Sequence, residues 1–216
     1  MKRPPRCAAF TLIEMITVIA IIVVLTGLIL SINGLVQRKA ANSRALGEIQ
    51  QLSAACEAYK TDNGGYPQDS SSNNYTDSLD AQKSTSPVTG SYANASLFLY
   101  KALTGDADAS GQIESTEKAK NYAQDFFKPS RLGTQTGQTV GSPKYVTFIM
   151  DPFGNSYGYS TAGLAAEQSF RTQLLTNSSA SRPGTQVGYN PTFDLWSTGG
   201  TTSGSASDLQ KWIKNW

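Results

Sequence analysis

Acidic and hydroxyl side chains recur at alternate positions at the start of the twelve-residue stretch 106–117. Oxygen-bearing side chains occupy its first, third and fifth positions, a glycine the sixth and a glutamate the twelfth: Asp106, Asp108, Ser110, Gly111 and Glu117. This is the spacing of an EF-hand calcium loop, in which the glycine allows a sharp turn and the last glutamate supplies two oxygens. In the same pattern the carbonyl of Gln112 faces the ion, and Glu114 binds it directly or through water.

We therefore expect a structural calcium site whose ligands are Asp106, Asp108, Ser110, Gln112, Glu114 and Glu117. Apolar side chains at 97–103 and at 122–127 predict a helix on each side of this loop. Millimolar calcium outside the cytoplasm would keep even a weak site filled, which favours a structural role over a sensor. The alternative is an acidic surface turn, because short Asp/Gly patterns also arise by chance.

A lone carboxylate, Glu14, stands at the start of a long apolar run. No charged side chain follows it until residue 38, and three basic residues precede it within the first nine. The segment 10–37 is long enough to cross a hydrocarbon core of about 30 Å as one helix. An ionised carboxylate at the edge of such a helix costs on the order of 2–3 kcal/mol, so Glu14 is expected to have a partner. An uncleaved membrane anchor explains the basic residues equally well but leaves Glu14 unexplained.

One long helix must position these groups, because no proline interrupts the sequence from Thr11 to about Asp62. Its second half carries apolar residues at spacings of four, three, four and three: Ala45, Ile49, Leu52, Cys56 and Tyr59. That amphipathic stripe needs a globular domain to cover it. We expect the membrane and assembly half over 10–37 and a globular domain over 38–216.

The C-terminal half reads as short strands separated by turns. Segments 144–150, 156–160 and 191–197 are rich in β-branched and aromatic residues, which favours strands. We expect the intervening residues 161–188 to be a polar connection, and residues 68–91 to be a surface loop. A small antiparallel sheet packed on the amphipathic half of the long helix gives an α+β fold.

Composition excludes several classes of function. The chain has no histidine, which excludes histidine-dependent triads and histidine metal sites. Its 18 basic and 16 acidic side chains nearly balance, so there is no electrostatic case for a nucleic-acid partner. Asp151 and Asp194 could be imagined as a catalytic pair, but both stand in turn or strand-start contexts where aspartate caps the backbone. We expect no enzyme activity.

The basic leader, a small residue and then Phe10-Thr-Leu-Ile-Glu14 resemble the processing signal of type IV pilin-like proteins. The resemblance implies that prepilin peptidase removes residues 1–9 by cutting between Ala9 and Phe10, and that the new Phe10 amine is methylated. It also implies that Glu14 neutralises the terminal amine of a neighbouring subunit during filament assembly. Ala9 departs from the glycine that this family usually has before the cut.

Three further segments resemble the major pseudopilin of type II secretion systems. They are Tyr-Lys-Thr-Asp-Asn-Gly-Gly-Tyr-Pro at 59–67, Asp-Pro-Phe-Gly-Asn-Ser-Tyr-Gly-Tyr at 151–159 and Phe-Asp-Leu-Trp-Ser-Thr-Gly at 193–199. The resemblance implies a structural subunit that crosses the bacterial inner membrane once, with its globular domain in the periplasm, and polymerises into a pseudopilus. A true type IV pilin for adhesion, motility or DNA uptake is the alternative, although such pilins often carry a C-terminal cysteine pair that this chain lacks.

The same resemblance implies a set of partners and a second calcium loop. The partners are other copies of the chain, prepilin peptidase, minor pseudopilins, the inner-membrane secretion platform and, before assembly, membrane lipid. The family's C-terminal calcium loop corresponds here to residues 199–208, and the resemblance gives Leu195, Ser197 and Asp208 as possible ligands. Residues 199–208 contain a single acid, and one carboxylate makes a poor site for a divalent cation.

Overall fold

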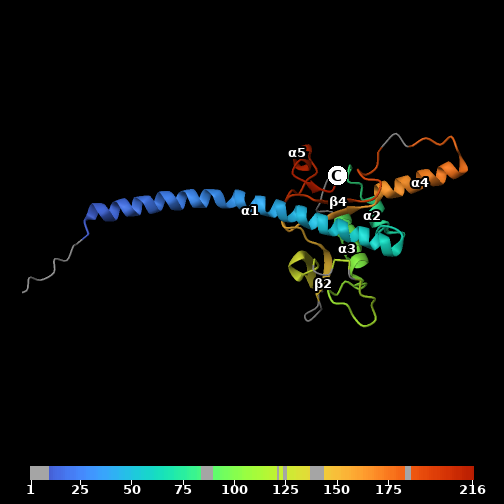
Figure 1. The fold of residues 1–216 in the computed structure, drawn as a ribbon, viewed down its shortest axis with the longest axis horizontal. Helices are drawn as coiled ribbons and strands as arrows, with labels where there is room; N and C mark the ends of the chain where they lie inside the picture. The colour runs from blue at the N-terminus through green and yellow to red at the C-terminus, as the bar shows by residue number, and fades with distance from the viewer. Residues whose placement is uncertain (1–9, 84–89, 121, 124–125, 137–143, 183–185) are drawn as a thin grey trace, which may run out of the picture. The chain divides into compact units, whose positions relative to one another are not determined.

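The fold is α+β, as the sequence predicts. This computed structural model describes residues 10–83, 90–120, 122–123, 126–136, 144–182 and 186–216, without the side chains of 28–33. It divides into two compact units, residues 1–40 and 41–216. Figure 1 labels the helices α1 to α5. Their bounds are α1 Leu12–Asn63, α2 Tyr75–Ser78, α3 Gly90–Thr104, α4 Ala162–Thr176 and α5 Ala206–Leu209, and a short 3-10 helix, η1, spans Pro129–Arg131.

Helix α1 covers 52 residues and confirms the predicted uninterrupted helix. Its predicted stripe faces the core, since Ala45, Ile49, Leu52 and Cys56 are all at most 2% exposed. In the first unit, by contrast, large apolar side chains from Phe10 to Leu25 are exposed. Among the described side chains, no helix has both the length and the apolar character needed to cross a membrane. The predicted membrane segment 10–37 includes 28–33, whose side chains lie outside that description.

The strands form two antiparallel sheets where the sequence predicts one. Strand β1 pairs with β2, and β4 lies between β3 and β5. The strands are β1 Leu132–Thr136, β2 Lys144–Ile149, β3 Gly158–Ser160, β4 Asp194–Ser197 and β5 Ile213–Lys214. A bridge between Met150 and Ser156 joins the sheets across the turn at 151–155. The predicted strands at 144–150, 156–160 and 191–197 are confirmed with shorter bounds.

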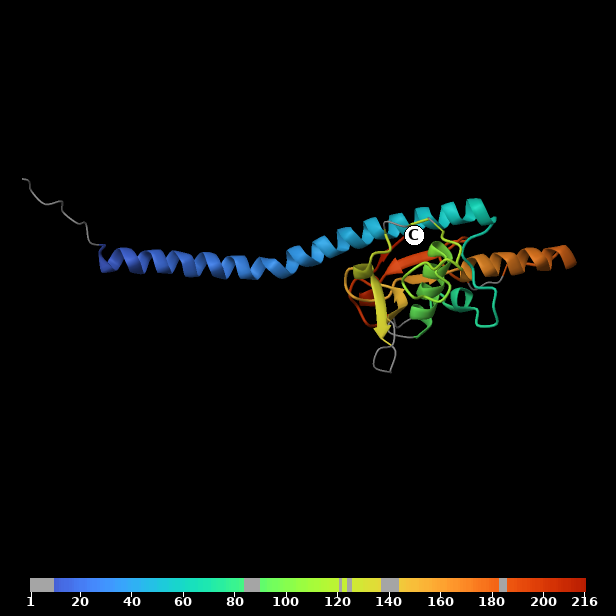
Figure 2. The same ribbon diagram turned by 90° about the horizontal axis from the view of Figure 1, so that it is seen from below.

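The core lies between the second half of α1, α3 and the strands (Figure 2). Glu48 of α1 is buried and accepts a hydrogen bond from Tyr157 Oη at 2.8 Å, while Arg131 Nε lies 3.4 Å from its other oxygen. A second cluster places Trp196 in a stacked pair with Trp212. The contacts of Glu48 link α1 to Tyr157 and to Arg131 of η1, so this buried carboxylate has both a hydrogen-bond donor and an opposite charge beside it.

Three sequence predictions are wrong in detail. The polar connection at 161–188 begins with helix α4, whose Ala, Leu, Glu and Gln residues are good helix formers. The predicted surface loop at 68–91 contains α2, and Asp69, Thr76 and Leu79 in it are buried. The helix predicted at 122–127 is not found among the described residues between 118 and 128, whereas helix α3 precedes the loop as predicted.

Candidate functional site

The start of α1 is closed by a reciprocal pair of hydrogen bonds. The Thr11 N–H donates to Glu14 Oε2 at 2.8 Å, and the Thr11 hydroxyl donates to the same oxygen at 2.8 Å. In return, the Glu14 N–H donates to Thr11 Oγ1 at 3.4 Å. This is a capping box, which satisfies N–H groups that the first turn of a helix otherwise leaves without a partner.

Glu14 therefore has a partner within its own chain. The predicted partner was the amine of a neighbouring copy; the pattern Thr-x-x-Glu ahead of an apolar run is the known signal for this partner within the chain. Phe10 is 77% exposed just ahead of the cap. Ala9 and the rest of the predicted leader lie outside the described residues. The predicted pairing of Glu14 with a neighbouring amine would thus replace or share an existing set of hydrogen bonds.

The predicted calcium loop brings three carboxylates together. Oxygens of Asp106, Asp108 and Glu117 all lie within 4.8 Å of one another. Two oxygens bound to one calcium ion, each about 2.3–2.6 Å away, can be at most about 5 Å apart. The three carboxylates therefore fit a single ion of this kind. Gly111 has φ +79°, the left-handed conformation that glycine adopts at no steric cost.

The remaining predicted ligands divide into two groups. Ser110 Oγ lies 2.8 Å from the carbonyl oxygen of Gln112, so these two oxygens lie side by side. The carboxylate of Glu114 is not among the gathered acids. Instead, the backbone N–H of Glu114 donates to Glu117 Oε2 at 3.0 Å. The structure thus brings the carboxylates of Asp106, Asp108 and Glu117 together and places Ser110 and Gln112 adjacent to one another.

Hydrogen bonds within the loop hold the carboxylates in place. Asp106 is fully buried, and its oxygens accept the N–H groups of Ser110 and Gly111 and the hydroxyl of Tyr100. Glu117 Oε1 accepts the N–H of Ala107 at 2.6 Å. An ionised carboxylate has about four acceptor positions, so these bonds leave it acceptor capacity for a cation.

Two backbone hydrogen bonds hold the loop in the fold. The Lys120 N–H donates to Thr104 O at 2.8 Å, which closes the loop against the end of α3. The Val146 N–H in β2 donates to Ala109 O at 2.7 Å. Ala109 has φ +62°, a conformation that costs a non-glycine residue about 1–2 kcal/mol. The link to β2 holds Ala109 in that conformation.

The residues of the second predicted calcium loop are each engaged elsewhere. The Leu195 carbonyl accepts the N–H of Asn215 at 3.1 Å. The Ser197 hydroxyl donates to Asp151 at 2.6 Å, and the Asp208 carboxylate pairs with Lys211 at 2.9 Å. Ser197 is fully buried, and Asp208 lies on short helix α5.

The two aspartates considered as a catalytic pair cap backbone groups. Asp151 accepts the N–H groups of Phe153 and Asn155 within its own turn. Asp194 accepts those of Tyr189 and Asn190. Burial raises the pKa of both carboxyls, and the hydrogen bonds partly offset that rise.

One comparison with known proteins identifies a motif at the N-terminus. The prokaryotic N-terminal methylation motif matches residues 4–30. This motif is found in type IV pilin-like proteins, and it implies processing by prepilin peptidase and polymerisation into pilus-like filaments. Comparison with curated proteins and with solved structures finds no match to this chain.

Proposed function

We propose that this chain is a structural subunit of a type II secretion pseudopilus, which drives protein export. The observation that carries the proposal is the methylation motif at residues 4–30. The α+β fold, with a long N-terminal helix on small antiparallel sheets, is consistent with a pilin-like subunit. The secretion branch is supported by the sequence segments at 59–67 and 151–159.

The proposed life cycle follows from this role. The chain enters the bacterial inner membrane through residues 10–37, with its globular domain in the periplasm. Prepilin peptidase cuts between Ala9 and Phe10, the Phe10 amine is methylated, and copies then leave the lipid to polymerise. Minor pseudopilins and the inner-membrane secretion platform are the proposed assembly partners, and the role is structural rather than enzymatic.

The capping box makes it possible to test the charge of Glu14 separately from its cap. Glu14→Gln keeps an oxygen that can accept the Thr11 N–H but removes the negative charge. Thr11→Ala keeps the charge but removes the capping hydroxyl, at a cost of about 1 kcal/mol. We expect Glu14→Gln to abolish filaments seen by electron microscopy, and Thr11→Ala to retain them. Both variants should still fractionate with the membrane.

Normal filaments from Glu14→Gln would refute pairing with a neighbouring amine. A second measurement separates the two branches of pilin-like function. We expect deletion of the gene to block release of secreted proteins while leaving adhesion, twitching motility and DNA uptake intact. Loss of those surface functions with normal secretion would instead favour the alternative, a true type IV pilin.

We also propose that residues 106–117 bind structural calcium. Asp106, Asp108 and Glu117 would supply the carboxylates, and Ser110 and Gln112 the neutral oxygens. The gathering of three carboxylates within 4.8 Å supports this assignment. Calcium would neutralise the clustered charge and link the end of α3 to β2. Calcium-dependent thermal stability tests the assignment. Because Asp208 is paired with Lys211, we place the calcium here rather than at Leu195, Ser197 and Asp208.

A further inference from the structure

A small open cavity lies beside η1, where α1, η1 and the turn after β2 meet within the unit 41–216. Its volume is about 280 Å³, and its lining is mostly polar. The lining includes three basic and two acidic side chains: Arg44 and Glu48 of α1, Lys128 and Arg131 at η1, and Asp151 in the turn. Basic side chains therefore outnumber acidic ones in this space, which we call the η1 cavity.

Both acidic side chains of the η1 cavity already have partners. Glu48 accepts a hydrogen bond from the Tyr157 hydroxyl at 2.8 Å and pairs with Arg131 Nε at 3.4 Å. Asp151 accepts a hydrogen bond from the Ser197 hydroxyl and two more from N–H groups of its own turn. Because each carboxylate is also buried, neither is placed to neutralise the exposed cations of the cavity.

Two of the three basic side chains, by contrast, have no acidic partner. Arg44 precedes Glu48 by four residues on α1, a spacing at which an arginine and a glutamate often pair. Glu48 pairs with Arg131 instead, and neither Arg44 nor Lys128 forms an ion pair with any residue that the structure describes. Both side chains are exposed. Their positive charges are therefore available to a ligand.

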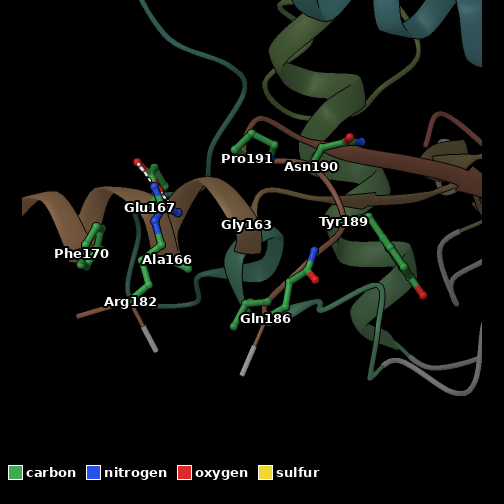
Figure 3. Close-up of a pocket in the computed structure, with 10 residues that line it drawn as sticks. Gly163, Ala166, Glu167, Phe170, Arg182, Gln186, Tyr189, Asn190 and Pro191 are labelled. Atoms are coloured by element: carbon green, nitrogen blue, oxygen red, sulfur yellow. Dashed lines mark hydrogen bonds and ion pairs between the residues drawn. The ribbon is translucent and has the colours of Figure 1, made fainter. Parts of the chain in front are cut away.

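The cleft beside α4 shows the opposite arrangement (Figure 3). Its acidic residue, Glu167, pairs with Arg171 at 2.9 Å and with Arg182 at 2.7 Å. The Arg182 guanidinium also lies 4.9 Å from the centre of the Phe170 ring. Each arginine at that cleft thus has an acidic partner, so the η1 cavity is the better place for an anion.

The donors of the η1 cavity suit a phosphate group. Guanidinium groups bind phosphate oxygens through two parallel N–H donors, and lysine binds phosphate as a point charge. Ser130 adds a hydroxyl to the lining. A phosphate group carries up to two negative charges and three terminal oxygens, so it can meet several separate cations, whereas a carboxylate offers one charge and two oxygens. The volume falls just below that of pockets for drug-sized ligands, about 300–1,000 Å³, which also favours a small group.

We propose that the η1 cavity binds a phosphate group through Arg44, Lys128 and Arg131, with Ser130 as a hydroxyl donor. The site does not depend on the proposed filament function. A soluble phosphate and the headgroup of an anionic lipid both carry this group. Arg44 lies seven residues beyond the segment 10–37 that we propose enters the membrane, so both sources are tested.

Thermal unfolding of the full chain in a neutral detergent tests the soluble source. The buffer holds sodium phosphate or sodium chloride at equal ionic strength, with EGTA to prevent calcium phosphate from forming. At a phosphate concentration ten times the Kd, binding shifts the unfolding equilibrium about elevenfold. In a domain of this size that shift raises Tm by about 3–6 °C.

Two substitutions and a matched control separate binding from general effects of the salt. Arg44→Gln and Lys128→Gln each remove one cavity charge and break no ion pair among the described residues. Lys144→Gln removes the charge of an exposed lysine on β2 that does not line the cavity. We expect each cavity variant to bind phosphate about tenfold more weakly, so that its Tm gain falls to about 1–2 °C. Lys144→Gln should keep the full gain.

Phosphate also stabilises folded proteins without binding, because it is excluded from their surfaces. Equal gains in all four chains would therefore exclude a site for soluble phosphate. The lipid source is tested with the same chains in phosphatidylcholine vesicles with or without phosphatidylglycerol. A gain from phosphatidylglycerol that the two cavity variants lose and Lys144→Gln keeps would assign the site to a lipid headgroup. The absence of a cavity-dependent gain with either source, or an equal loss in Lys144→Gln, would overturn the proposal.

Discussion

The proposed calcium site at residues 106–117 can be tested with two matched substitutions, because one removes a gathered carboxylate and the other a neighbouring carboxylate that is not gathered. Glu117→Gln neutralises one of the three acids that lie within 4.8 Å of one another. Glu114→Gln neutralises an acid three residues earlier whose carboxylate is outside that group. Both variants lose one negative charge from the same loop, so they differ in position rather than in net charge.

The expected magnitude follows from the exposure of the loop. Asp108 is exposed and Glu117 half-buried, which places the site with weak extracellular modules of Kd about 10⁻⁴–10⁻³ M. At a calcium concentration ten times the Kd, binding stabilises the folded chain by about 1.4 kcal/mol. In a domain of this size, each kcal/mol shifts Tm by about 2–4 °C. Calcium should therefore raise Tm by about 3–6 °C.

The assay is thermal unfolding of the full chain in detergent, followed by fluorescence of the core tryptophans, Trp196 and Trp212. We expect Tm to be higher in calcium than in EGTA for the parent chain and for Glu114→Gln. For Glu117→Gln we expect this difference in Tm to disappear. The baseline Tm of Glu117→Gln in EGTA should also fall, because Glu117 accepts backbone N–H groups through both oxygens. The increment alone therefore tests binding. An unchanged parent Tm on adding calcium would refute the site, and equal increments in both variants would refute the role of Glu117.

Two further predictions concern the buried polar groups. Tyr157→Phe removes the hydroxyl that donates to buried Glu48, so we expect the free energy of unfolding to fall by about 2 kcal/mol and Tm to fall by about 4–8 °C. The control is Tyr145→Phe, at an exposed tyrosine. Equal losses of stability in the two variants would contradict the reasoning. Burial raises the pKa of Asp151, so the folded chain binds this proton more tightly than the unfolded chain does. The free energy of unfolding should therefore rise as pH falls from above that raised pKa towards about 4. Asp151→Asn should lack this part of the pH dependence in urea titrations, and an identical profile would show that Asp151 does not titrate in this window.

The sequence predicts those elements whose signal is local and periodic. The stripe from Ala45 to Tyr59 repeats at helical spacing, and the structure buries its first four residues and half-buries Tyr59. Strand β2 is marked by its own Tyr, Val, Phe and Ile residues. Strand β1, Leu-Gly-Thr-Gln-Thr, has no such pattern, and its partner β2 defines it through pairing. Helix α4 differs from the predicted polar connection because its Ala, Leu, Glu and Gln residues favour a helix despite their mostly polar character.

The candidate sites divide in the same way. The spacing from Asp106 to Glu117 predicts that Asp106, Asp108 and Glu117 gather, because the ligand positions lie within twelve residues of sequence. It does not predict that Glu114 stays outside the group, since a hydrogen bond from its N–H to Glu117 sets its backbone position. The pattern Thr-x-x-Glu in the sequence is enough to predict the capping hydrogen bonds of Glu14. The engagement of Ser197 by Asp151 joins residues 46 apart and needed the fold.

The buried row on α1 determines how a subunit carries mechanical load. Ala45, Ile49, Leu52 and Cys56 lie in one line along the helix axis, each packed in the globular core. A pull along that axis strains all four contacts together in shear. A sideways pull would peel them away one after another, at much lower force. The packing of α1 against the core thus resists a pulling force best when that force acts along the helix axis.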